Sequence, residues 1–146
     1  MKKQLKNLTC LLLLICSLYG QDVTAQQPND QTTFELLSHA ISQEFFWTAS
    51  SINMEDLSKL YILDHGVALD LPESFAIKSI PVEIIQKNQI SAIGNQPLIQ
   101  VHTLNVNKDK ALVRLYLTYK QTGEEKSSNS EFLYEHNGTN WVLTTK

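Results

Sequence analysis

The sequence predicts an α+β domain in which N-terminal helices pack on one face of a curved antiparallel sheet of about four to five strands. Apolar residues between positions 32 and 49 recur at helical spacing, as they do in a helix with one buried face. After Pro97 apolar residues instead alternate with polar ones, and short polar segments interrupt the alternation, as in strands joined by turns. Helices followed by strands in this way are typical of the α+β class.

Two helices are expected before residue 67. The first begins at Thr32, because Thr32 and Glu35 fit a capping box, in which two side chains satisfy backbone N–H groups. It is predicted to extend for about 18 residues. Asn53 can cap a second, shorter helix, which Gly66 ends. The apolar face of the first helix consists of Phe34, Leu36, Leu37, Ala40, Ile41, Phe45 and Trp47, and that of the second of Leu57, Leu60 and Tyr61.

The segment from residue 67 to residue 97 has the weakest pattern. Residues 67–69 can form a short strand, and residues 80–85 alternate as a second strand does. Pro81 has no N–H to donate to a sheet, so residues 80–85 are predicted to lie at a sheet edge. Residues 86–97 are polar and end in Gly94-Asn95-Gln96-Pro97, which predicts a loop.

Four strands are predicted in the C-terminal part, over residues 98–106, 111–120, 130–136 and 139–145. Tight polar residues at 107–110 connect the first two, and residues 121–129, with Gly123 and paired serines, predict a loop. Asn137 and Gly138 both tolerate positive φ, which predicts a hairpin turn before the last strand. The second strand has the clearest alternation, and one of its faces consists of Ala111, Val113, Leu115, Leu117 and Tyr119.

The N-terminus has the pattern of a secretory signal peptide. Three lysines precede a short apolar run from Leu8 to Leu18, and Val23 and Ala25 supply small residues for cleavage after Ala25, with Gly20 as the second choice. A membrane span needs about 20 apolar residues, so a retained anchor is the less favoured alternative. We therefore expect a secreted or periplasmic protein with a signal at residues 1–25, a flexible leader at 26–31 and a single domain at 32–146.

Removal of the signal excludes several functions. Cys10 and Cys16 both lie in it, so the mature chain would have no disulfide and no thiolate. Neither cysteine follows a small residue, as lipid anchoring requires, since Thr9 and Ile15 precede them. Cleavage after Ala25 also changes the net charge from −3 to −5. An acidic chain with scattered lysines argues against binding to nucleic acid or to an anionic membrane.

Residues that could carry chemistry are few. No Gly-x-Ser-x-Gly elbow occurs, and the four histidines are far apart in sequence, so neither a nucleophile, a metal site nor a cofactor is expected. Acid–base chemistry in an apolar pocket remains open, although each candidate also fits an ordinary turn or sheet residue. The pocket candidates are Tyr61, Asp64, Asp70, His102, Tyr116 and Tyr119.

A contact surface is also predicted on the second face of the strand at residues 111–120. Leu112, Arg114 and Tyr116 point away from the main core face, and tyrosine and arginine are enriched in protein interfaces. This face can bind a protein partner or a second copy of the chain. The alternative is a solvated face with scattered apolar residues.

The C-terminal pattern resembles the NTF2-like (nuclear transport factor 2-like) and cystatin-like superfolds. The resemblance lies in Ala-Leu-Val-Arg-Leu-Tyr-Leu-Thr-Tyr at 111–119, the polar segment after it, and residues 132–143, where a Gly turn precedes Trp141. It implies a cone-shaped domain whose helices and sheet can enclose a pocket. Some such domains are isomerases or dehydratases, and others are non-catalytic modules.

Three functions therefore stay open for the chain. The first is an exported, non-catalytic domain that binds a small apolar ligand or a protein partner. The second is an NTF2-like lyase or isomerase, and the third is an envelope or assembly component. Fold resemblance alone does not choose among them.

Overall fold

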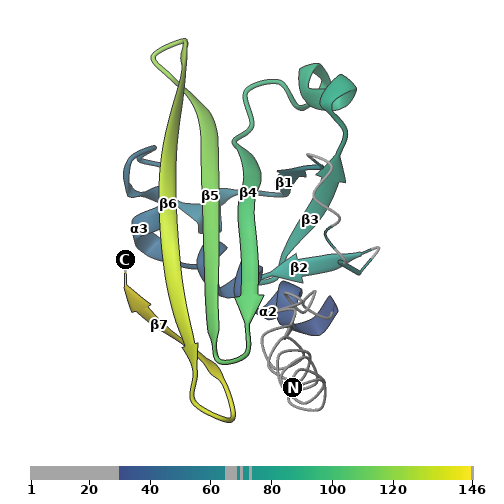
Figure 1. The fold of residues 1–146 in the computed structure, drawn as a ribbon. Helices are drawn as coiled ribbons and strands as arrows, with labels where there is room; N and C mark the ends of the chain where they lie inside the picture. The colour runs from purple at the N-terminus through teal and green to yellow at the C-terminus, as the bar shows by residue number, and fades with distance from the viewer. Residues whose placement is uncertain (1–29, 65–68, 70, 73, 146) are drawn as a thin grey trace, which may run out of the picture.

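The computed structural model describes residues 30–64, 69, 71–72 and 74–145, and the signal and most of the expected leader lie outside them (Figure 1). Its helical segments are α2 (Asp30–Ile41), α3 (Glu44–Thr48) and the 3₁₀ helices η1 (Met54–Asp56) and η2 (Lys87–Ile93). Its strands are β1 (Leu60–Leu63), β2 (Phe75–Ile77), β3 (Ile80–Ile85), β4 (Leu98–Asn107), β5 (Lys110–Gln121), β6 (Glu124–His136) and β7 (Trp141–Thr145).

These strands form one mixed sheet of seven strands in the order β2-β3-β1-β4-β5-β6-β7. β1 runs parallel to both β3 and β4, and the other neighbours are antiparallel. The predicted fold, helices on an antiparallel sheet of four to five strands, is therefore wrong. The sheet is larger because residues expected to be helical form β1, which joins β2 and β3 to the C-terminal strands.

The second predicted helix fails because β1 is buried on both faces. Leu60 and Ile62 pack in the main core, whereas Leu63 packs on the other face with Ile85 and Leu98. A strand covered on both sides carries a continuous apolar run, which periodicity cannot distinguish from a buried helix. Only η1 keeps a helical turn in this segment, and Asn53 caps it by accepting a hydrogen bond from the Glu55 amide.

The first predicted helix is divided in two. α2 already includes Asp30 and ends at Ile41, and a separate short helix, α3, begins at Glu44. Thr32 therefore lies inside α2 and is not its N-cap, and Asp30 and Gln31 belong to the helix rather than to a leader. The break lets Phe46 and Trp47 turn into the core, where they are almost fully buried.

β3 is not an edge strand, contrary to the prediction, because β2 pairs with it on the outside. Ile77 and Ile80 flank a two-residue turn, so Pro81 occupies the next, non-hydrogen-bonded position opposite Ala76. Its nitrogen points away from β2, toward β1, whose pairing with β3 begins only at Val82. Pro81 is thus tolerated inside the sheet because no ladder needs its N–H.

The C-terminal strands form the predicted antiparallel meander, with one extended hairpin. β6 begins at Glu124, so the loop predicted at residues 121–129 is wrong. The turn consists of Thr122 and Gly123, whose φ values of 54° and 86° match a two-residue hairpin turn. β7 pairs with β6 only from Leu133 to His136, and no other described strand pairs with β6 residues 124–132 on that side.

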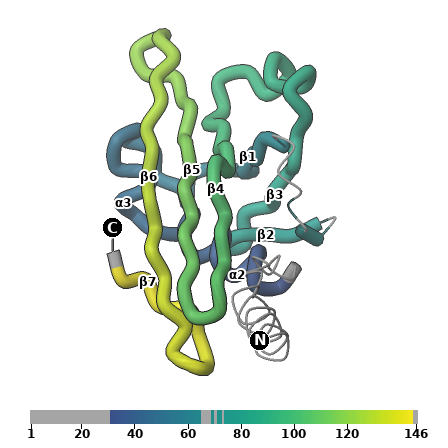
Figure 2. The backbone as a smooth tube through the Cα atoms, viewed as in Figure 1, coloured from purple at the N-terminus to yellow at the C-terminus, as the bar shows by residue number. Residues whose placement is uncertain are grey.

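The main core lies between α2, α3 and one face of the sheet. α2 and α3 lie behind β4, β5 and β6 in Figure 1, and the tube view gives the same layers (Figure 2). No described element lies in front of these strands. η2 packs Ile90 and Ile93 only on the smaller cluster near β1 and β3. The side chains exposed below 2 % in this fold include Leu36, Leu37, Ile41, Phe46, Ile99, Leu115, Phe132 and Tyr134.

Truncation of Leu115 tests whether β5 anchors this core. Leu115 is fully buried, and Leu115→Ala should lower the free energy of unfolding by about 2–5 kcal/mol, through lost burial and a residual cavity. Ile84 is 39 % exposed, and Ile84→Ala as a control should cost less than about 1 kcal/mol. Urea denaturation followed by circular dichroism measures both. Equal losses in the two variants would contradict this assignment of the core.

Candidate functional site

The face of β4–β7 turned away from α2 and α3, here called the outer face, is not covered by any described element (Figure 1). Alternation along β5 places Ala111, Val113 and Leu115 in the core and turns the residues between them outward. The outward residues of β5 are Lys110, Leu112, Arg114, Tyr116, Thr118 and Lys120. The interface residues predicted from the sequence, Leu112, Arg114 and Tyr116, therefore share this face.

The outer face has a row of positive charge beside a row of negative charge. The register of β5 and β6 places Lys110 opposite Glu135, Arg114 opposite Glu131 and Lys120 opposite Glu125. Arg114 Nε donates to Glu131 Oε2 at 2.5 Å, and Lys110 Nζ lies 3.6 Å from Glu135 Oε1. All the outward cations of β5 thus face a carboxylate on β6. Sequence reasoning missed these pairs because it does not give the register between two strands, and because it placed Glu125 in a loop.

An apolar pair lies between two of these ion pairs. Leu112 and Leu133 are cross-strand partners. Along the outer face, the next pair on one side is Lys110–Glu135 and the next pair on the other side is Arg114–Glu131. The two leucines line an open depression of about 340 Å³ that Thr144 of β7 also lines. Leu133 is 37 % exposed and Val142, on β7, is 46 % exposed, so this end of the face presents apolar surface to solvent.

A second depression of about 370 Å³ lies on the other side of Arg114 and Glu131. His102 contributes to it because it follows the buried Val101 and so faces outward, where its ring packs edge-on against Tyr116 at 5.3 Å. Its Nδ1 lies 2.9 Å from the Thr103 hydroxyl. His102 is therefore part of a polar and aromatic surface on the outer face, with Arg114, Tyr116, Asn129, Ser130 and Glu131 around it.

Most of the predicted acid–base residues lie apart, and only His102 and Tyr116 are neighbours among those described. Tyr119 lies on the core face of β5, where its hydroxyl donates to the carbonyl of Ala49 at 2.9 Å and ties β5 to the end of α3. His102 lies on the opposite face of the sheet, so the sheet separates the two side chains. Tyr119 has a structural contact that accounts for its burial.

The pocket candidates Tyr61 and Asp64 do not join His102 or Tyr119 in a described pocket. Tyr61 packs against the small cluster beside η2, and Asp64 follows β1 and accepts a hydrogen bond from Gln86 Nε2 at 2.8 Å. Asp70 lies outside the described residues. Neither Tyr61 nor Asp64 lines a depression with His102 or Tyr119. Within the described residues the structure thus brings together only His102 and Tyr116 of the predicted set, on the outer face.

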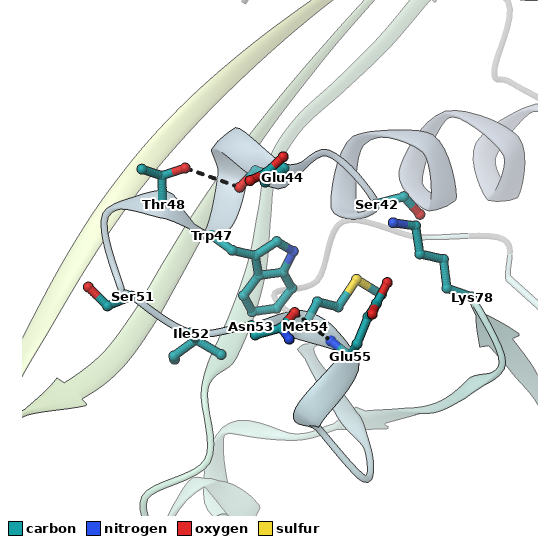
Figure 3. Close-up of a pocket in the computed structure, with 10 residues that line it drawn as sticks. All are labelled: Ser42, Glu44, Trp47, Thr48, Ser51, Ile52, Asn53, Met54, Glu55 and Lys78. Atoms are coloured by element: carbon teal, nitrogen blue, oxygen red, sulfur yellow. Dashed lines mark hydrogen bonds between the residues drawn. The ribbon is translucent and has the colours of Figure 1, made fainter.

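A further depression of about 500 Å³ is on the helical side and was missed by sequence reasoning (Figure 3). Its lining residues come from α3, from the segment around η1 and from Lys78 in the β2–β3 turn. Trp47 forms part of its wall but is only 3 % exposed, and its Nε1 already donates to the Ile41 carbonyl at 2.8 Å. Glu44, Glu55 and Lys78 give it mixed charge, and no buried polar group of this wall is left to orient a ligand.

Tyr134 is the most strongly perturbed titratable group of the described chain. It is 1 % exposed at the core face of β6, and its hydroxyl lies 3.2 Å from Nδ1 of His39 on α2. Burial raises the pKa of Tyr134 well above its ordinary value near 10, because the phenolate would lose its hydration. The neutral side chain therefore belongs to the packing of α2 on the sheet.

Neither a metal cluster nor a membrane-spanning helix occurs among the described residues. No three His, Cys, Asp or Glu side chains come together there as metal ligands. None of the helices in that part of the chain has both the length and the apolar character that crossing a membrane requires. Comparison of the chain with protein-family models, curated proteins and solved structures found no match. The resemblance to NTF2-like and cystatin-like domains stays a hypothesis based on the strand pattern.

Alkaline titration tests the burial of Tyr134. Its folded-state pKa is raised, so its contribution to stability is complete below the unfolded value of about 10 and is lost as pH rises above it. The free energy of unfolding of the wild type should fall above about pH 10, and that of the Tyr134→Phe variant should fall less steeply. Urea denaturation at a series of pH values measures both slopes. Identical slopes in the two proteins would show that Tyr134 ionises in the folded state.

Proposed function

We propose that the protein is an exported, non-catalytic binding module that contacts a protein partner through its outer face. The observation that carries the proposal is the Leu112–Leu133 pair, which is framed by two ion pairs on an uncovered sheet face. Protein interfaces share this arrangement of an apolar centre with a polar and charged border. Arg114 and Tyr116, on the same face, belong to residue types that often dominate binding energy.

The packing of the described interior supports contact rather than catalysis. Side chains of α2, α3 and the sheet fill the space between them, and residues such as Leu36, Ile99 and Leu115 are fully buried. A lyase or isomerase needs an acid or base and a donor around one substrate in an apolar pocket. Here Tyr119 lies in the core, and the neighbouring His102 and Tyr116 lie on the opposite, outer face. A contact module is also compatible with the third hypothesis, an envelope or assembly component.

Export is proposed from the pattern of residues 1–25, which lie outside the described residues. Expression of the full chain in a secreting bacterial host should release a mature protein that begins at Gln26. Intact-mass spectrometry and N-terminal sequencing measure the cleavage site. Replacement of Ala25 by a large residue, Ala25→Trp, should block cleavage or move it, because the −1 position accepts only small residues. A mature protein that retains Met1 would contradict export by a cleaved signal.

A photo-crosslinking residue at position 133 tests the contact surface. The side chain at 133 lies at the apolar centre of the outer face, so light should link it to a partner in cells that produce the protein. Ile84 has nearly the same exposure, 39 % against 37 % for Leu133, and lies on β3, so a crosslinker there is the matched control. Mass spectrometry then identifies the adducts.

We expect a saturable adduct from position 133 and none from position 84. Leu112→Asp should remove the adduct, because a carboxylate placed beside the crosslinker disrupts the apolar centre. Equal adducts from both positions, or no adduct from position 133, would refute the proposed surface.

A further inference from the structure

We infer that the outer face binds a second copy of this chain, related by a two-fold axis that lies in the interface and runs parallel to β5 and β6. The inference rests on the proposed function and identifies the partner. It starts from the two charge rows, because a surface with one basic and one acidic row can complement itself.

The charge rows select this axis. When the axis passes between β5 and β6, β5 of one copy lies over β6 of the other, with residues at the same level facing each other. Arg114 then faces Glu131 of the partner subunit, and Lys110 faces Glu135 of the partner subunit. An axis across the strands would place β5 over β5 and oppose like charges along the whole row. Only the axis along the strands pairs every row with its complement.

The apolar pair fits the same arrangement. Leu112 and Leu133 occupy one level of the sheet, so the rotation brings Leu112 against Leu133 of the partner subunit, and the reverse. Four leucine side chains meet at the centre, between the charge levels. The contact thereby covers Leu133, which is 37 % exposed in the single chain. Sheets that pack face to face lie about 10 Å apart, which leaves room for one interdigitated layer of side chains.

Two alternative explanations, one for the ion pairs and one for association of two copies, predict different behaviour. The ion pairs could serve only the β5–β6 hairpin, but exposed pairs of this kind contribute little to stability and give no reason for the exposed leucine. The unpaired edge of β6 at residues 124–132 could instead join two copies edge to edge through backbone hydrogen bonds. Edge pairing does not depend on which of the two outward residues, 114 or 131, carries the positive charge.

A charge-swapped double variant, Arg114→Glu with Glu131→Arg, distinguishes face-to-face pairing from both alternatives. It keeps an ion pair within each chain, so the hairpin keeps its cross-strand contact. In a dimer of two swapped chains the opposing charges are complementary again. In a mixed dimer with the wild type, Arg114 faces an arginine and Glu131 faces a glutamate, so the mixed dimer is disfavoured.

The measurement uses the wild type and the swapped protein with different fluorophores, together with sedimentation analysis of each alone. We expect each protein to dimerise by itself, more weakly at high salt, and energy transfer between the two to be absent after mixing. The matched control is the Lys59–Glu83 pair, which has a contact of 2.7 Å and similar exposure but lies beside β1 and β3. Its swap, Lys59→Glu with Glu83→Lys, should mix freely with the wild type.

Free mixing of the Arg114–Glu131 swap with the wild type would refute the inference and favour edge pairing. A wild-type protein that stays monomeric at its highest soluble concentration would refute it as well. If that monomer still forms an adduct with a different protein from position 133, the proposed contact function stands and only the identity of the partner is wrong.

A single variant covers the case in which the swapped chain does not fold. Leu133→Lys places a cation at an already exposed position between Glu131 and Glu135 of the same strand, so the fold should keep its circular dichroism spectrum. The dimer should dissociate, because the lysine faces Leu112 of the partner subunit. A Leu133→Lys protein that dimerises as well as the wild type would refute the inference.

Discussion

The long pairing of β5 with its two neighbours is the constraint on which the structure depends. All twelve residues of β5 pair with β6 without a register shift, and residues from Lys110 to Thr118 also pair with β4 across one bulge. Because its side chains alternate strictly, β5 has two faces with different contacts. Its core face carries α2 and α3, with Tyr119 bonded to Ala49, and its outer face carries the basic row that complements β6. A slip of one residue would exchange the two faces and remove both the core and the contact surface.

The C-terminal strands could be predicted because their apolar and polar residues alternate. The other elements could not be predicted, because their sequences fit more than one kind of structure. Residues 111–120 have one apolar face, so the strand and its outward residues could be assigned from sequence alone. Leu60–Leu63 is apolar throughout, which fits a buried helix as well as a strand covered on both faces. Residues 124–131 are polar on both faces, and polarity without alternation resembles a loop.

The candidate site could be predicted only in part, for a related reason. Leu112, Arg114 and Tyr116 were found because they lie on one predicted strand, but their partners Glu131 and Leu133 depend on a register that sequence does not give. The candidate acid–base residues could be named from sequence, but the face of the sheet on which each side chain lies could not. Tyr119 is directed to the core, whereas His102, which follows the buried Val101, is directed outward. The charge rows emerge only when two strands are placed in register.

The unpaired edge of β6 has a consequence for solubility. Its backbone groups from Glu124 to Phe132 could serve as a template for a misfolded chain, and a long neutral edge of this kind promotes aggregation. The side chains along it include Glu124, Glu125, Lys126 and Glu131, which an incoming chain would have to bury or oppose. The charges of β6 thus act as gatekeepers against fibril growth. Mutations that neutralise them should promote aggregation in concentrated solution even where the fold is unchanged.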